Sequence, residues 1–118
     1  MSILKDRFEA APYSWKVLRL TGEDTPDDVK LPVGPVLVPL AVWRARRAEL
    51  IRREYEHGWP LGVWLAAEES PAAIKHDIDD FTVIGVDSNK ARDGNRYLAV
   101  RHLLEGLGYR GAVAPTAA

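Results

Sequence analysis

Three short apolar segments, each followed by a stretch long enough for a helix, constrain the fold of this chain more than any other feature. They are residues 36–38 (VLV), 61–65 (LGVWL) and 82–86 (TVIGV). Because their apolar residues are continuous and do not alternate with polar ones, each segment is typical of a strand buried on both faces. Their starts lie about 20–25 residues apart, which is the spacing of βαβ units in a parallel sheet.

The first connecting segment predicts a helix over residues 40–56. On a helical wheel, five of its residues fall on one stripe, and this stripe predicts the face that packs on the sheet. The stripe consists of Ala41, Ala45, Ala48, Ile51 and Tyr55, and Trp43 and Leu50 widen the apolar arc to one side. His57 and Gly58 provide a stop, since glycine adopts the left-handed conformation that commonly ends a helix.

Two further helices are expected. Ser70 can cap the second helix and Pro71 fits its first position. This helix would bury three apolar residues at helical spacing, Ile74, Ile78 and Phe81. The third helix is expected to begin near Asp93 or Asn95 and to end at Gly106. Its buried residues would be Tyr97, Val100, Leu103 and Leu104.

The two ends of the chain have weaker patterns. Residues 14–20 (SWKVLRL) alternate loosely and predict a strand, either at a sheet edge or in a hairpin arm, and residues 111–114 can begin a further strand. We therefore predict an α/β fold with a short parallel sheet of three to four strands built from βαβ units. Residues 1–34 would form an irregular N-terminal arm, residues 35–114 a single α/β domain, and residues 115–118 a frayed tail.

Composition excludes several classes of function. The 118 residues include 16 Lys and Arg against 17 Asp and Glu, whereas a domain that neutralises many phosphates carries a basic excess, so nucleic acid is not expected as a partner. The absence of cysteine excludes disulfides, Fe–S clusters and Cys nucleophiles.

The N-terminus has no apolar stretch typical of a signal peptide, and residues 31–43 are too short to span a bilayer. No membrane contact is therefore expected, and the chain is predicted to be cytoplasmic.

No cofactor or metal is expected either. The chain contains no G-x-G-x-x-G, P-loop or G-x-S-x-G motif, so nicotinamide, nucleotide triphosphate and serine-hydrolase chemistry have no direct support. His57, His76 and His102 are isolated, and none shares a metal-binding spacing with another histidine. His76 lies beside several aspartates, but these acidic residues are expected on a helix surface.

The best candidate for chemistry is the stretch after the third predicted strand. Its candidate residues are Asp87, Lys90, Asp93, Gly94, Arg96 and Tyr97. Ligands of parallel α/β folds bind beyond the carboxyl ends of the strands, where helix N-termini also point. Two carboxylates and two cations there could hold an anion or a hard cation, or transfer protons. The alternative is that these residues only cap the helix, form a turn and pair with one another.

A second group of residues suggests protein contacts. Residues 40–57 carry five arginines against three glutamates, whereas residues 68–93 carry seven acidic residues against three basic ones. Such asymmetry can steer a partner. Arg46 and Arg53 lie opposite the alanine stripe, and Trp59 lies in a turn between Gly58 and Pro60. We therefore predict Trp59, Arg46 and Arg53 as partner-binding residues, with core packing as the alternative for Trp59.

The order of segments resembles a known family. The pattern comprises VLVPL at 36–40 before a helix, LGVWL at 61–65 with AEESP at 67–71, and VIGVD at 83–87. This arrangement is similar to an uncharacterised bacterial family described as oxidoreductases of sulfite reduction, whose members are encoded beside the sirohaem-containing sulfite reductase. The family's stretch D-F-P-K-F-x-D-G-R-G-Y-S is matched here by Asp87, Lys90, Asp93, Gly94 and Tyr97.

The resemblance is incomplete, and its departures shape the functional prediction. Ser88, Asn89 and Ala91 replace two aromatic residues and a proline of the family pattern, and the chain lacks the family's further strand and helix. The resemblance therefore implies a shortened, divergent member that is an accessory or small structural subunit, linked to assimilatory sulfite reduction. Its partner would be a larger enzyme subunit or a second copy of the chain. The alternative is a stand-alone enzyme that acts on a small anionic substrate through residues 87–97.

Overall fold

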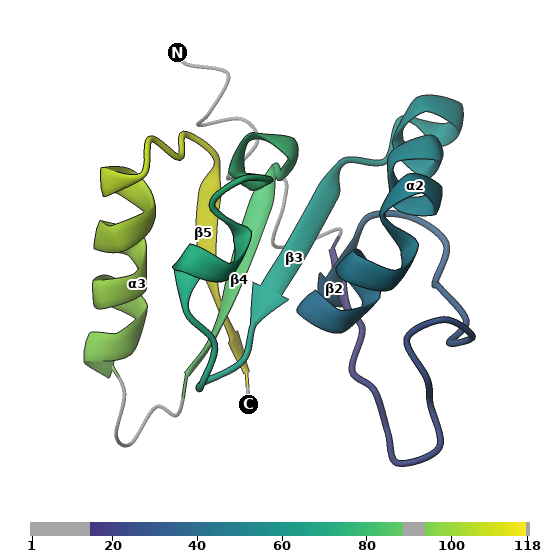
Figure 1. Cartoon of the computed structure of the whole chain (residues 1–118), viewed down its shortest axis with the longest axis horizontal. Coiled ribbons are helices and arrows are strands. Elements are labelled where there is room, and N and C mark those ends of the chain that lie inside the picture. The colour runs from purple at the N-terminus through teal and green to yellow at the C-terminus, as the bar shows by residue number, and fades with distance from the viewer. Residues whose placement is uncertain (1–14, 89–93, 118) are drawn as a thin grey trace.

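The computed structural model describes residues 15–88 and 94–117 of the chain. These residues form five strands, two α-helices and two short 3₁₀ helices (Figure 1). The strands are β1 (Lys16–Val17), β2 (Val36–Pro39), β3 (Leu61–Leu65), β4 (Val83–Ser88) and β5 (Ala112–Ala117). The helices are α2 (Leu40–His57), η1 (Pro71–Ile74), η2 (Ile78–Asp80) and α3 (Gly94–Gly106).

All five strands are parallel, and their order in the sheet is their order in the chain. Connections between parallel strands are right-handed. Because each strand here is added to the same edge of the sheet as the one before it, right-handed connections all cross the same face. Figure 1 shows α2 and α3 in front of the sheet in this way. The predicted α/β fold with a parallel sheet is confirmed, but the predicted strand count of three to four is wrong.

The additional strands lie at the two edges of the sheet. β1 is an edge strand that pairs with β2, with Lys16 beside Val36, so residues 14–20 do not form a hairpin arm. At the other edge, β5 pairs with β4 from Ala112 to Ala117. The strand therefore continues past Ala114, where the sequence placed the end of the domain, because its backbone stays in register with the whole of β4. Ala118 lies outside the described residues.

The sheet has apolar residues on both faces, as the continuous apolar segments predict. Val38, Val63 and Ile84 point to the face covered by the helices and belong to the main core. Leu37 and Val83 point to the opposite face, where the rings of Trp15 and Trp64 pack against them. The second face thus carries a smaller apolar cluster of its own.

Helix α2 packs on the sheet through the side of its apolar arc that carries Trp43 and Leu50, and not through the alanines of the predicted stripe. Val42, Trp43 and Leu50 are buried and Ile51 is half-buried against the core. The three alanines are exposed, and Tyr55 is 85% exposed. The free energy of burial grows with apolar area, so burying an indole and two branched side chains outweighs burying three methyl groups. The helix also kinks at Arg46, whose backbone angles are not helical, so one regular wheel does not describe its full length.

The second predicted helix is divided into η1 and η2. Ser70 caps η1 as predicted, since its side chain accepts a hydrogen bond from the Ala72 N–H, and Ile74, Ile78 and Phe81 are buried. The carboxylate of Asp77 accepts hydrogen bonds from α2 instead of continuing a helix, with Arg47 at 3.0 Å and the Trp43 indole N–H at 3.3 Å. In α3, Val100 and Leu104 are buried as predicted, but Leu103 is 57% exposed.

A close approach of two segments requires glycine at position 111. A Cβ atom added to Gly111 would overlap the Tyr109 ring and lie 2.8 Å from the Thr82 carbonyl oxygen. The Tyr109 hydroxyl is held within hydrogen-bond distance of the Phe81 and Ala112 carbonyls, at 3.1 and 3.2 Å, so the ring cannot move freely.

Replacement of Gly111 by alanine should therefore destabilise the protein by about 1–3 kcal/mol, through overpacking against Tyr109 and the Thr82 carbonyl. Gly106→Ala is the matched control, because a Cβ atom there meets no heavy atom within 4 Å. Urea denaturation measures both free energies of unfolding. Equal stability of the two variants would contradict the close packing at Gly111.

Candidate functional site

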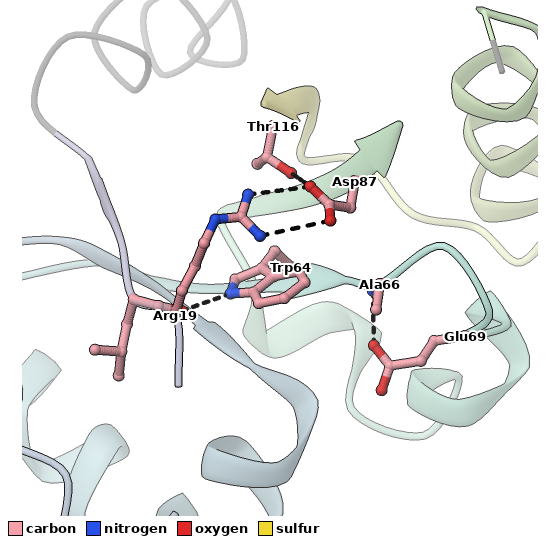
Figure 2. Close-up of polar contacts among 7 residues, drawn as sticks. Arg19, Trp64, Ala66, Glu69, Asp87 and Thr116 are labelled. Carbon is pink, nitrogen blue, oxygen red and sulfur yellow. Dashed lines mark hydrogen bonds and ion pairs between the residues drawn. The ribbon is translucent and has the colours of Figure 1, made fainter. Parts of the chain in front are cut away.

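Side chains from four separate segments meet near the carboxyl ends of the central strands (Figure 2). Asp87 lies near the end of β4, and Thr116 lies opposite it in β5 as its cross-strand partner. Arg19 follows β1, and Trp64 lies near the end of β3. This is the edge of a parallel sheet at which ligands are generally bound, which makes the group a candidate site.

The carboxylate of Asp87 is shared between two donors. Its Oδ1 atom accepts hydrogen bonds from Arg19 Nη2 and from Thr116 Oγ1, both at 3.0 Å, and its Oδ2 atom lies 3.5 Å from Arg19 Nη1. The side chain of Asp87 is only 15% exposed. The carboxylate thus ties the segment after β1 to the opposite side of the sheet.

The indole of Trp64 completes this group. The guanidinium carbon of Arg19 lies 4.7 Å from the centre of the Trp64 ring, at which distance a cation is attracted to the ring face. The Trp64 indole N–H donates to the Leu18 carbonyl at 2.8 Å, so both ends of the contact fix the same segment. Gly85 lies beside Trp64 on β4, where a Cβ atom would lie 2.8 Å from Thr116 and 3.0 Å from Trp64.

Arg96, in the first turn of α3, also joins two segments of the chain. Its Nη2 atom donates to the carbonyls of Ala66 at 2.6 Å and Glu69 at 3.0 Å, both in the turn after β3. The Glu69 carboxylate in turn accepts from the Ala66 N–H at 2.7 Å (Figure 2). The Nε atom of Arg96 is buried and makes no hydrogen bond with the described residues. Arg96 therefore anchors the first turn of α3 to the β3–η1 turn.

The candidate stretch after β4 is thus only partly assembled into one site. Asp87 and Arg96 are both bonded to other segments and not to each other, Gly94 begins α3, and the Tyr97 hydroxyl donates to the Val113 carbonyl at 2.9 Å. Lys90 and Asp93 lie outside the described residues. Among the described residues, these side chains hold other segments of the chain in place and do not pair with one another, and their predicted role in binding or catalysis stays a prediction.

Sequence reasoning missed Arg19 and Thr116, the two partners of Asp87. They lie 68 and 29 positions from it in the chain, and no local spacing connects them to it. A signal was nevertheless present: Arg19 follows a candidate strand, and a parallel sheet places the ends of all its strands at one edge. A strand prediction extended beyond Ala114 would have brought Thr116 to the same edge.

The predicted partner-binding arginines face inward and not toward solvent. The Arg46 guanidinium donates to the Val29 carbonyl and to both Glu49 oxygens, at 2.5, 3.0 and 2.6 Å. Arg53 Nη2 donates to the Pro32 carbonyl at 2.5 Å. These bonds fasten the segment before β2 onto α2. The hydrogen bonds from Arg46 lower the pKa of Glu49, and they raise the pKa of Arg46, whereas burial lowers the pKa of Arg53.

Trp59 lies half-buried at the same corner of the molecule. Its ring stacks on His57 with a centroid distance of 4.3 Å, and the guanidinium carbon of Arg53 lies 4.9 Å from its centre. A shallow hollow of about 490 Å³ beside it is lined by Trp59, by Arg46, Glu49 and Arg53 of α2, and by residues 28–33. Trp59, Arg46 and Arg53 as partner-binding residues stay a prediction, and the two arginines in addition bind other residues of the chain.

Within residues 15–88 and 94–117, no three histidine, aspartate or glutamate side chains are arranged to bind one metal ion. In the same residues, neither helix has the length and apolarity needed to cross a bilayer.

Comparison with known proteins gives one match. The model of a family described as "Bacterial protein of unknown function (DUF934)" matches residues 62–117, slightly less than half of the chain. The matched region begins in β3 and ends with β5, so it includes β4 and the stretch on which the predicted resemblance depends. The resemblance to an uncharacterised bacterial family is supported to this extent, and the family's description states no reaction. No curated protein and no solved structure matches the chain.

The role of Asp87 can be tested through stability. Asp87→Asn removes the charge that holds Arg19 and should lower the free energy of unfolding by about 1–3 kcal/mol, since a partly buried charged hydrogen bond is lost. Glu105→Gln removes a carboxylate from the exposed pair with Arg101 and should cost less than about 0.5 kcal/mol. Urea denaturation compares the two variants, and similar losses would contradict a structural role specific to Asp87.

The ion pair of Arg46 and Glu49 predicts a dependence on pH. Because folding lowers the pKa of Glu49, its contribution to stability is present above the pKa of the unfolded chain and is lost as the pH falls through the folded value. The Glu49 side chain is 45% exposed, so Glu49→Gln should cost less than about 1 kcal/mol at pH 7 and nothing near pH 3. Glu56→Gln, a change at an exposed position without an ion pair among the described residues, is the control for urea denaturation at both pH values. A pH-independent loss in Glu49→Gln would refute this account.

Proposed function

We propose that this chain is a non-catalytic accessory subunit that binds a larger metabolic enzyme, and that the enzyme belongs to assimilatory sulfite reduction. The observation that carries the proposal is the engagement of Asp87. A general base or a ligand-binding carboxylate needs a lone pair directed at its substrate, whereas the Asp87 carboxylate is held between Arg19 and Thr116. Its bonds join segments of the chain, as expected of a scaffold.

A second observation supports protein binding. β5 is an edge strand, and within the described residues no further strand lies beside it. An unpaired strand edge is a template for association with another chain. Leu98 and Leu103 on α3 and Leu107 just after it are each more than 40% exposed, although burying such side chains in a complex is favourable. The link with sulfite reduction depends on the resemblance of the sequence alone.

The alternative of a stand-alone enzyme acting through residues 87–97 requires Lys90 and Asp93, which lie outside the described residues. Alanine substitutions at these two positions separate the two functions. An accessory subunit should keep its assembly with the partner, whereas an enzyme should lose turnover of its anionic substrate and keep its assembly state.

Light scattering coupled to size-exclusion chromatography tests the proposed role. The purified chain is mixed with the purified sirohaem-containing sulfite reductase of the same bacterium, and the proposal predicts one peak with the combined mass. The chain alone is the control, and it also reports whether a second copy binds. Separate elution of the two proteins at micromolar concentrations would reject sulfite reductase as the partner.

A further inference from the structure

The outer side of β5 presents backbone groups that no strand among residues 15–88 and 94–117 uses. The Ala112 N–H donates to the Thr82 carbonyl at 3.0 Å, so the polar groups of Ala112 face β4. The polar backbone groups of successive strand residues point to opposite sides, so those of Val113 and Pro115 point away from the sheet. The hydrogen bond from the Tyr97 hydroxyl to the Val113 carbonyl agrees with this direction.

The shape of this edge favours one added strand over a second sheet. Pro115 has no N–H and interrupts the row of donors, a common protection of edge strands. Helix α3 packs on the helix-covered face, with Val100 and Leu104 in its core, and lies to the side of β5 in the view of Figure 1, so a neighbouring sheet with helices on the same face would meet α3. Between α3 and β5 lies a groove of about 410 Å³, lined by Tyr97, Arg101 and Glu105 of α3 and by residues 109–113.

The charges around the groove indicate the chemistry of its occupant. Arg101 pairs with Glu105 at 3.1 Å, which leaves Arg110 as a further cation at the mouth of the groove. Arg110 is exposed and forms no ion pair with the residues that the structure describes. An adjoining hollow shares Arg101 and Glu105 with the groove and adds Leu98, which is 55% exposed. This surface suits a segment that combines acidic and apolar side chains.

We propose that β5 binds one extended acidic segment of a partner protein, which adds to the sheet as a further strand. The Val113 N–H donates to a carbonyl of this segment, the Pro115 carbonyl accepts from one of its N–H groups, and Arg110 faces one of its carboxylates. The inference rests on the proposed accessory role in assigning the segment to a partner, and it specifies where and how that partner binds.

A peptide experiment tests the backbone and charge parts of this proposal separately. The probe is a short capped peptide of alternating valine and glutamate, titrated into the ¹⁵N-labelled chain. The expected result is a Kd below about 1 mM, with the largest amide shifts in β5. Replacing glutamate by lysine should abolish the shifts, and so should N-methylation of alternate peptide bonds, which removes the pairing N–H groups. No binding of the first peptide, or equal binding of the N-methylated one, would overturn the proposal.

Substitutions in the protein complete the test. Arg110→Glu should weaken binding of the acidic peptide about fivefold, since an exposed charge contributes up to about 1 kcal/mol. Arg44→Glu makes the same change at an exposed position of α2 and should leave binding unchanged. Equal affinity of the two variants would contradict the proposed groove. If the complex with sulfite reductase forms and is unaffected by Arg110→Glu, the site is wrong while the accessory role stands; if only the peptide binds, that enzyme is not the partner.

Discussion

The order of the strands in the parallel sheet determines the rest of this structure. Each strand is added beside the previous one, and right-handed connections then place every helix on the same face. The opposite face and the β5 edge receive no helix. The features that distinguish this chain, namely the tie between Arg19 and Asp87 and the open side of β5, lie on the parts of the sheet that the helices do not cover.

The packing of side chains on the helix-free face of the sheet requires glycine beside the large residues. Leu37 pairs in register with Gly62, and Trp64 pairs with Gly85, so each large side chain lies beside a position without a Cβ atom. Trp15 lies directly above Gly62, where a Cβ atom would be 2.5 Å from its ring. Such packing covers part of the helix-free face of the sheet with the chain's own side chains.

The sequence predicted the central strands because burial on both faces leaves a continuous apolar signature that needs no tertiary information. It centred the apolar arc of α2 on alanines and placed Trp43 and Leu50 at its side, because a wheel weighs spacing and not buried area. Arg46 and Arg53 appeared solvated because their contacts with residues 29–34 depend on the tertiary structure. It located Asp87 and Arg96 correctly at the carboxyl edge of the sheet. Their partners could not be predicted, since Arg19 meets Asp87 only through the pairing of five strands.

The central claim is that β5 is a sheet edge whose outer side is free to pair. Amide hydrogen exchange, followed by NMR on the isolated chain, measures this directly, since an N–H bonded within the sheet exchanges only when the structure opens. The account predicts alternating protection along β5, with slow exchange at Ala112, Ala114 and Thr116 and fast exchange at Val113. If Val113 is as strongly protected as Ala112 and Ala114, another segment already occupies the outer side of β5 and the claim is wrong.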